Sequence, residues 1–117
     1  MKKVIIIDDS EMILNDVSRK LQEAGFKVIT INKGLGASQL ILSEEPDLII
    51  LDVKMPALSG DELLSILKDT MDPPPPVILF SDLEASELQQ ISSKYNTPYL
   101  TKSDRALLVN KVRELVG

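Results

Sequence analysis

The amino-acid sequence predicts an α/β fold: a doubly wound sandwich in which helices cover both faces of a five-stranded parallel sheet. Two observations support this prediction. Short runs rich in β-branched residues alternate with longer stretches of helical period along the whole chain. The runs are apolar along their length rather than alternating, which is typical of strands that helices cover on both sides.

Five strands and five helices are expected. The strands are predicted at residues 4–7 (VIII), 27–31 (KVITI), 47–52 (DLIILD), 77–80 (VILF) and 98–100 (PYL). The helices are predicted to begin near Ser10, Leu35, Gly60, Leu83 and Ser103. With the strand order 2-1-3-4-5, the first and third strands are neighbours at the point where the order reverses.

Three helices show an apolar face at helical spacing. We expect this face to lie in the core: Ile13, Val17, Leu21 and Ala24 in the first helix, Leu63, Leu64, Leu67 and Met71 in the third, and Leu108, Val112 and Leu115 in the fifth. Ser10 suits the N-cap of the first helix, and Gly25 is a C-terminal signal.

The segment from Asp72 to Pro76, DPPPP, separates the third helix from the fourth strand. Because proline cannot donate to a central ladder and holds its predecessor extended, the strand is expected to begin at about Val77. We interpret the prolines as a stiff connector, and a polyproline ligand for a partner is the alternative.

Length and composition indicate one domain covering residues 1–117 and exclude several functions. A net charge of -5 without a basic block argues against nucleic-acid binding by the domain. No apolar run reaches the length of a membrane span. The absence of cysteine excludes disulfides and thiolate chemistry and fits a cytoplasmic location. The absence of histidine excludes a Ser-His-Asp triad, the usual zinc sites and phosphohistidine on this chain.

The residues that follow the strands carry the chemistry, because a doubly wound sheet binds ligands beyond the carboxyl ends of its strands. They are Asp8 and Asp9 after the first strand, Asp52 after the third, Ser81 after the fourth and Lys102 after the fifth. Three carboxylates would therefore meet a hydroxyl and an ammonium in one crevice.

Three carboxylates in one crevice would raise each other's pKa values unless a cation neutralised them. Mg²⁺, or Mn²⁺ in its place, suits such a site because it prefers oxygen ligands, keeps several waters and readily takes a phosphoryl oxygen. A carboxylate can also be the nucleophile that accepts a phosphoryl group. The cation and Lys102 would then stabilise the charge on the phosphoryl oxygens.

Four segments together carry a resemblance to a known family. They are IIIDDS at 5–10, LIILDVKMPALSGDELL at 48–64, VILFSD at 77–82 and PYLTKS at 98–103. Any one of them is weak, but the four in this order and spacing are highly specific. Over essentially its whole length, the chain resembles the receiver domains of two-component response regulators, which share the flavodoxin-like fold of the chemotaxis protein CheY.

The resemblance implies a role for each residue of the crevice. Asp52 would be the phosphoacceptor and Lys102 the phosphate-binding lysine. Asp8 and Asp9 would bind the metal together with Asp52 and the backbone carbonyl of Lys54. Ser81 would be the switch hydroxyl and Tyr99 the switch aromatic.

Simpler structural interpretations stand beside these roles. Asp9 and Ser10 would suffice to cap the first helix, and Asp52 could be a turn residue at a strand end. Tyr99 could be half-buried core with its hydroxyl in water.

Three residues depart from the family pattern. Ser103 follows Lys102, where the family usually has a proline with a cis bond before it, so we expect a trans bond and a differently aimed Lys102. Asp82 adds a fourth acid near the crevice unless it caps the fourth helix. Lys54 would place an ammonium near Asp8 and Asp9, in competition with a divalent cation; the alternative is that it projects into solvent.

The first hypothesis is a phosphorylation-switched receiver rather than a stand-alone enzyme. It would accept a phosphoryl group on Asp52 from the phosphohistidine of a sensor histidine kinase or phosphotransfer protein, and would catalyse only its own phosphorylation and dephosphorylation. Ser81 and Tyr99 would change the surface of the fourth helix, fifth strand and fifth helix, where a downstream protein would bind. Homodimer formation is left open.

Two other hypotheses remain beside the first. One is a pseudo-receiver that acts as a phosphorylation-independent interaction module. The other, a stand-alone Mg²⁺-dependent phosphohydrolase, is disfavoured because the chain has no room for a cap.

Overall fold

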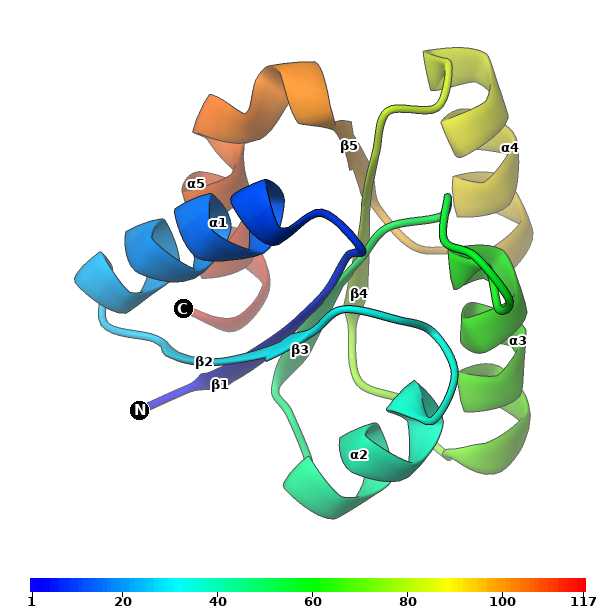
Figure 1. The fold of residues 1–117 in the computed structure, drawn as a ribbon. Coiled ribbons are helices and arrows are strands. Elements are labelled where there is room, and N and C mark those ends of the chain that lie inside the picture. The colour runs from blue at the N-terminus through cyan, green and yellow to red at the C-terminus, as the bar shows by residue number, and fades with distance from the viewer.

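The computed structural model describes residues 1–117 and contains one five-stranded parallel sheet between two layers of helices (Figure 1). The strands are β1 (Lys3–Ile7), β2 (Lys27–Ile31), β3 (Leu48–Leu51), β4 (Val77–Ser81) and β5 (Tyr99–Thr101). The helices are α1 (Glu11–Glu23), α2 (Ala37–Glu44), α3 (Gly60–Thr70), α4 (Ala85–Tyr95) and α5 (Leu108–Val116), with a 3₁₀ segment η1 (Lys102–Leu107) before α5. The strand order β2-β1-β3-β4-β5 confirms the prediction.

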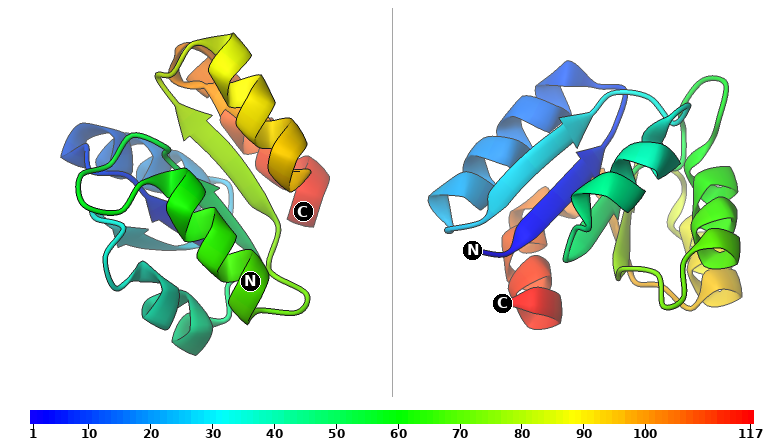
Figure 2. Two further views of the ribbon diagram at one scale, coloured as in Figure 1. Left: turned by 90° about the vertical axis from the view of Figure 1, so that its right-hand side faces the viewer. Right: turned by 90° about the horizontal axis from the view of Figure 1, so that it is seen from below.

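The sheet separates two apolar layers, and the central strands contribute alternate residues to each. In β1, Val4 and Ile6 pack in the layer that contains the apolar faces of α1 and α5. Ile5 and Ile7 pack in the layer of α2, α3 and α4 on the opposite face (Figures 1 and 2). The same alternation holds along β3 and β4. Because both faces are covered, a slip of register would exchange the two layers, and the strand ends are therefore fixed.

The edge strands differ from the prediction that all strands are apolar along their length. In β2, Lys27 and Thr30 are exposed, and the three residues of β5 are only half-buried. Each edge strand has a neighbour on one side only, so the covering layers reach it incompletely.

Three helices begin later than the sequence predicted. The second helix begins at Ala37 rather than near Leu35, because Gly36 precedes it in the left-handed region with φ 80°. The fourth begins at Ala85, because its N-cap residue, Glu84, is extended with ψ 143°. In the fifth, η1 occupies the first six residues and the α-helix begins at Leu108. By contrast, α1 with its Ser10 cap, α3 at Gly60 and β4 at Val77 begin where they were predicted.

The predicted core position Leu115 is wrong, because this side chain is 39% exposed. Leu108 and Val112 are buried as predicted, and Val109 and Val116 pack against the same cluster. The buried face of α5 therefore consists of Leu108 and Val112, with the partly buried Val109 and Val116 beside them, and Leu115 lies outside it.

The loop between β3 and α3 brings the start of the helix directly onto the end of the strand. The amide of Gly60 donates to the carbonyl of Val53 at 2.9 Å. A Cβ at Gly60 would clash with the backbone carbonyl of Asp52, so only glycine fits here. Ser59 caps α3, and Glu62 completes a capping box with it. These contacts fix the backbone beside Asp52.

None of the helices combines the length and apolar character needed to cross a membrane.

The same loop contains a strained residue whose replacement tests its geometry. Ala57 has φ 69°, in the left-handed region, and is exposed. This conformation costs an L-residue about 1–2 kcal/mol, more than the roughly 0.5–1 kcal/mol by which glycine raises the entropic cost of folding. We expect Ala57→Gly to raise the free energy of unfolding by about 0.5–1 kcal/mol in urea titrations. Ala85→Gly, at the first turn of α4, should lower it. A loss of stability in Ala57→Gly would contradict the loop geometry.

Candidate functional site

The carboxyl ends of β1 and β3 place two aspartates side by side. The amide of Asp8 donates to the carbonyl of Ile31 on β2 at 3.0 Å, and the amide of Asp52 donates to the carbonyl of Ile7 on β1 at 2.9 Å. Both residues thus continue the hydrogen-bond ladder past the last strand residue. Both residues are nearly inaccessible, with 1% of Asp8 and 3% of Asp52 exposed. The switch-point rule therefore identified the crevice correctly.

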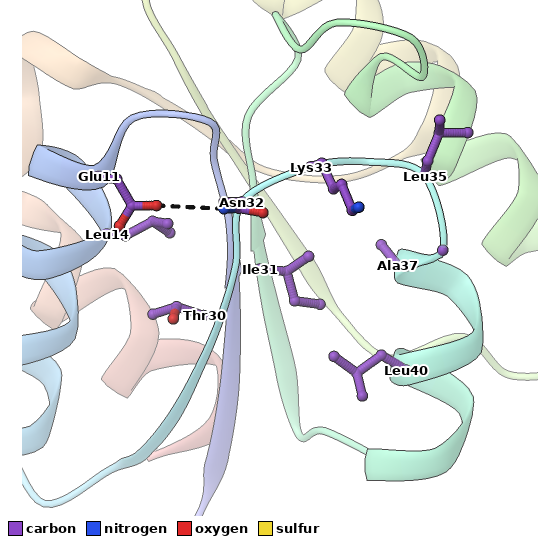
Figure 3. Close-up of a pocket in the computed structure, with 10 residues that line it drawn as sticks. Glu11, Leu14, Thr30, Ile31, Asn32, Lys33, Leu35, Ala37 and Leu40 are labelled. Atoms are coloured by element: carbon purple, nitrogen blue, oxygen red, sulfur yellow. Dashed lines mark hydrogen bonds between the residues drawn. The ribbon is translucent and has the colours of Figure 1, made fainter.

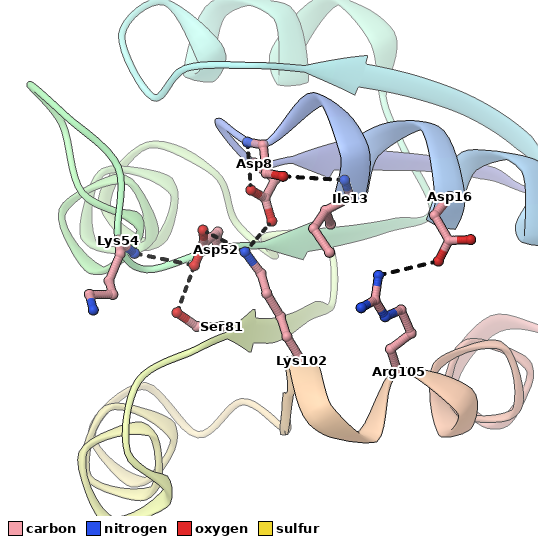
Figure 4. A network of polar contacts seen from close by, with 9 residues as sticks. Asp8, Ile13, Asp16, Asp52, Lys54, Ser81, Lys102 and Arg105 are labelled. Atoms are coloured by element: carbon pink, nitrogen blue, oxygen red, sulfur yellow. Dashed lines mark hydrogen bonds and ion pairs between the residues drawn. The ribbon is translucent and has the colours of Figure 1, made fainter.

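The ammonium of Lys102 lies between these two carboxylates (Figure 4). Its Nζ is 2.9 Å from Oδ2 of Asp8 and 3.1 Å from Oδ2 of Asp52. The Lys102 side chain is only 10% exposed. A pair of buried carboxylates needs such a partner, because an uncompensated buried charge is strongly destabilising.

The other oxygen of Asp52 accepts two further hydrogen bonds. The hydroxyl of Ser81 donates to Oδ1 at 2.6 Å, and the backbone amide of Lys54 donates to the same oxygen at 3.3 Å. Ser81 is fully buried at the end of β4. The hydroxyl that the sequence placed in the crevice is therefore in direct contact with the predicted phosphoacceptor.

Asp9 completes a cluster of three carboxylates. One oxygen from each of Asp8, Asp9 and Asp52 lies within 4.8 Å of the others, and Asp9 is exposed. Ser10, not Asp9, caps α1, since its hydroxyl accepts the amide of Ile13 at 3.3 Å. Three carboxylates and one ammonium leave two negative charges, and the ligands are all oxygens. The residues therefore fit a hard divalent cation.

Burial and charge act differently on the two ends of the central ion pair. Burial raises the pKa of Asp8 and outweighs the hydrogen bonds that Lys102 and the amide of Ser10 donate to its carboxylate, and the negative charge of Asp52 raises it further. Burial alone would lower the pKa of Lys102, but its contacts with Asp8 and Asp52 outweigh it and raise that pKa. The crevice thus favours the charged form of Lys102 and disfavours the charged form of Asp8.

Two of the three departures from the family pattern can be judged from these contacts. The bond between Lys102 and Ser103 is trans as expected, because the only cis peptide is Asp72–Pro73. The expectation of a redirected Lys102 is wrong, because the ammonium reaches both acids. Lys54 is exposed and forms no ion pair, and its side chain points away from the acids (Figure 4). The geometry thus favours the solvent-facing alternative for Lys54.

The third departure, Asp82, is exposed and does not cap α4, whose N-cap residue is Glu84. Tyr99 is half-buried and packs against the layer of α2, α3 and α4. Its role as a switch stays a prediction, as does the role of the Lys54 carbonyl in a metal shell.

Sequence reasoning missed three features of the site. The sequence predicted Gly60 as the start of the third helix, but not that its lack of a Cβ lets α3 approach Asp52. The pair between Arg105 and Asp16, at 3.5 Å, ties η1 to α1 and joins residues far apart in sequence. The hydroxyl of Thr101, next to Lys102, contacts Ser103 and Asp104. Only the Thr-x-Ser-Asp spacing hinted at the last feature.

A separate hollow of about 520 Å³ lies between the start of α1, the end of β2 and α2 (Figure 3). Its lining includes Leu14, Ile31 and Leu40, and the amide of Asn32 donates to the carboxylate of Glu11 at 3.5 Å across its edge. It shares no residue with the acidic crevice and contains a single carboxylate, so the chemistry of the chain is concentrated in the crevice.

Comparison with known proteins agrees with this geometry. Residues 4–113 match the family model described as the response regulator receiver domain. The chain belongs to this family. It is 31% identical over 102 residues to the transcriptional regulatory protein KdpE of Mycobacterium tuberculosis. The matched region covers 87% of this chain and 45% of KdpE. The chain spans less than half of the length of the curated relatives it matches.

Solved receiver structures share the whole fold. The receiver domain of the Francisella response regulator 1452 is 32% identical, with a TM-score of 0.88 over 99% of this chain and 97% of that one. The response regulator TrrA of Thermotoga maritima, solved in complex with Mg²⁺-BeF, is 29% identical, with a TM-score of 0.87 over 98% of this chain and 99% of that one. The chain is thus a two-component receiver with an acidic pocket, a signalling module whose family implies a partner histidine kinase.

The raised pKa of Asp8 predicts how stability depends on pH without metal. A raised folded-state pKa means that the folded protein binds this proton more tightly, so its stability contribution is present below the ordinary value, near 3.8, and is lost as the pH rises through the folded value. Asn cannot ionise. In urea titrations with a chelator, Asp8→Asn should therefore gain stability relative to the wild type as the pH rises from 3 to 7.

Asp16 provides a control of opposite sign. Burial opposes its ionisation, but hydrogen bonds from Lys20 and Arg19 outweigh burial and lower its pKa. Its contribution is present above the ordinary value and is lost as the pH falls through the folded value. Asp16→Asn should therefore lose stability relative to the wild type as the pH rises. The same trend in both variants would contradict the electrostatic description of the crevice.

Proposed function

We propose that this receiver switches by phosphorylation of Asp52, which takes its phosphoryl group from the phosphohistidine of a sensor histidine kinase or phosphotransfer protein. The observation that carries this proposal is the environment of the Asp52 carboxylate. It lies at the end of β3, contacts the ammonium of Lys102 and the hydroxyl of Ser81, and adjoins two further acids. No other carboxylate of the chain combines an ammonium, a hydroxyl and a metal-binding cluster.

In the proposed transfer, a carboxylate oxygen of Asp52 forms a bond to phosphorus while the phosphorus–nitrogen bond of the partner's phosphohistidine breaks. The imidazole nitrogen keeps the bonding electron pair and takes up a proton. Lys102 then exchanges its contact with Asp52 for one with a phosphoryl oxygen, so that its charge stabilises the transferred group. The hydroxyl of Ser81 already points at this carboxylate and can donate to the product.

The acidic cluster supports a divalent cation, Mg²⁺ or Mn²⁺, as the cofactor. Asp8, Asp9 and Asp52 would bind it, with the backbone carbonyl of Lys54 as a further ligand, and Mg²⁺ when bound would neutralise charge on the phosphoryl oxygens. The relative TrrA, solved with Mg²⁺-BeF, supports this assignment. The two negative charges that Lys102 leaves unbalanced match a dication.

The output of the switch would be a change in the surface formed by α4, β5 and α5. Ser81 ends β4, and its register partner on β5 is Thr101, two residues after Tyr99. A shift of Ser81 toward the phosphoryl group would therefore act on the strand that carries Tyr99. A downstream protein would bind this surface, and a second copy of the chain is the alternative occupant. We also propose that residues 1–117 form a single receiver domain that works in the cytoplasm.

The pseudo-receiver alternative is less well supported. It rested on residues expected to disturb the crevice, but Lys102 reaches both acids, and Lys54 and Asp82 are exposed. None of the three departures removes a group that the transfer needs.

Phosphoryl labelling tests the acceptor directly. Incubation with a small phosphodonor and Mg²⁺ should raise the mass of the protein by one phosphoryl group, and Asp52→Asn should abolish this increase because an amide is not a nucleophile. Asp82→Asn is the matched control, since it removes an exposed acid next to Ser81, and it should be labelled like the wild type. Labelling that survives in Asp52→Asn would remove the central assignment.

Metal titration tests the acidic cluster. We expect Asp9→Asn to weaken Mg²⁺ binding by about tenfold in calorimetric titrations, because one carboxylate ligand or neighbour is lost. Lys54→Ala should bind Mg²⁺ like the wild type at low salt, because the exposed ammonium forms no ion pair with the acids. Tighter binding by Lys54→Ala would instead revive the competition hypothesis, and an unchanged affinity in Asp9→Asn would exclude Asp9 from the metal site.

A further inference from the structure

Lys102 is followed by a short network of side-chain hydrogen bonds where its family usually has proline. The Oγ1 of Thr101 lies 2.8 Å from the Oγ of Ser103 and donates to Oδ2 of Asp104 at 3.2 Å. These three residues surround Lys102 in sequence and span the junction between β5 and η1. Their side chains form no hydrogen bond with Asp8, Asp9 or Asp52.

The direction of the network follows from counting protons. A hydroxyl has one proton to donate, and that of Thr101 goes to the carboxylate of Asp104. The contact between Thr101 and Ser103 must then be donated by Ser103. The order Ser103 to Thr101 to Asp104 ends on a charged acceptor, which strengthens each link. Thr101 precedes η1 as its N-cap residue but accepts no backbone amide, so its hydroxyl is committed to these side chains.

We propose that Thr101, Ser103 and Asp104 form a positioning clamp that fixes the backbone on both sides of Lys102 and so aims the Lys102 ammonium at Asp8 and Asp52. The clamp acts through Lys102, and its three side chains form no hydrogen bond with the carboxylates of the crevice.

The two flanks of the clamp are anchored to different parts of the fold. Thr101 is in register with Ser81, so the strand side is fixed to β4 and to the hydroxyl that contacts Asp52. On the helical side, Arg105 pairs with Asp16 on α1 at 3.5 Å (Figure 4). Between these anchors, Asp104 departs from helical geometry with φ -98° and ψ 26°. The clamp thus spans the one irregular stretch between two fixed points.

The effect of this clamp on phosphoryl chemistry rests on the proposed function. Lys102 would contact the transferred phosphoryl group, and a small misplacement of a positioning cation is costly. Beryllofluoride, which stands in for a phosphoryl group on a carboxylate, is the probe that reports this contact without turnover. The affinity for Mg²⁺ without beryllofluoride reports only on the three acids.

The test compares Thr101→Val, which keeps the shape and removes the hydroxyl, with Thr101→Ser, which keeps the hydroxyl. Beryllofluoride affinity is measured by calorimetry in saturating Mg²⁺ for both variants, and again for Thr101→Val in a Lys102→Met background. We expect Thr101→Val to bind about threefold to tenfold more weakly, as fits the loss of the exposed hydrogen bonds of Thr101. Thr101→Ser should stay within about twofold of the wild type.

The Lys102→Met background separates positioning from a general structural role. If Thr101 acts through Lys102, Thr101→Val causes no further loss once the ammonium is absent. An equal loss in both backgrounds, or wild-type affinity in Thr101→Val, would overturn the clamp.

A second measurement tests the clamp even if the proposed function fails. That failure would be seen if the wild-type protein neither bound beryllofluoride nor was labelled at Asp52. Wild type, Thr101→Val, Lys102→Met and the double variant are then unfolded in urea without metal. Because Lys102 pairs with Asp8 and Asp52 in that state, the clamp predicts a departure from additivity of at least about threefold in the unfolding equilibrium constant. Additive effects would overturn it.

Discussion

One buried ammonium, held between two buried carboxylates, is the interaction on which the rest of this site depends. Asp8 and Asp52 are almost inaccessible, and each would be costly without a cationic partner. Lys102 partners both. The contact requires the carboxyl ends of β1, β3 and β5 to open onto one crevice, which the order β2-β1-β3-β4-β5 ensures. The two apolar layers that fix the register therefore also fix the distances between these charges.

Lys102 neutralises only part of the negative charge in the crevice, because the crevice contains three carboxylates and one ammonium. Burial, together with the negative charge of Asp52, raises the pKa of Asp8 despite its ion pair with Lys102. A receiver with a fully balanced crevice would be more stable without metal, but it would attract a dication less strongly. The site thus gives up stability where function needs negative charge. Rigid contacts nearby, such as that of Gly60 with the backbone of Asp52, limit how far the acids can move apart.

The sequence predicted those parts of the molecule that depend on strong periodic or positional signals. The central strands and the acids that end them followed from buried apolar runs that stop at Asp8 and Asp52. Other features could not be predicted, because they depend on distances between segments. The exposure of Leu115 depends on which face of α5 meets the sheet, and the close approach of Gly60 depends on how α3 lies on β3. The hydroxyl network beside Lys102 depends on backbone angles that the missing proline left open.

The contrast between Lys54 and Lys102 shows why nearness in sequence misleads about charge. Lys54 is two residues from Asp52, yet only its backbone amide reaches that carboxylate, and its ammonium is exposed. In this loop, the backbone amide of Lys54 faces the Asp52 carboxylate while its side chain points away from the acids (Figure 4). Lys102 lies 50 residues from Asp52 and approaches from a different strand end, which lets the whole side chain extend into the pocket. Because Lys102 is carried on separate backbone, its ammonium would be able, in the proposed transfer, to change its partner from carboxylate to phosphoryl oxygen without moving the acids.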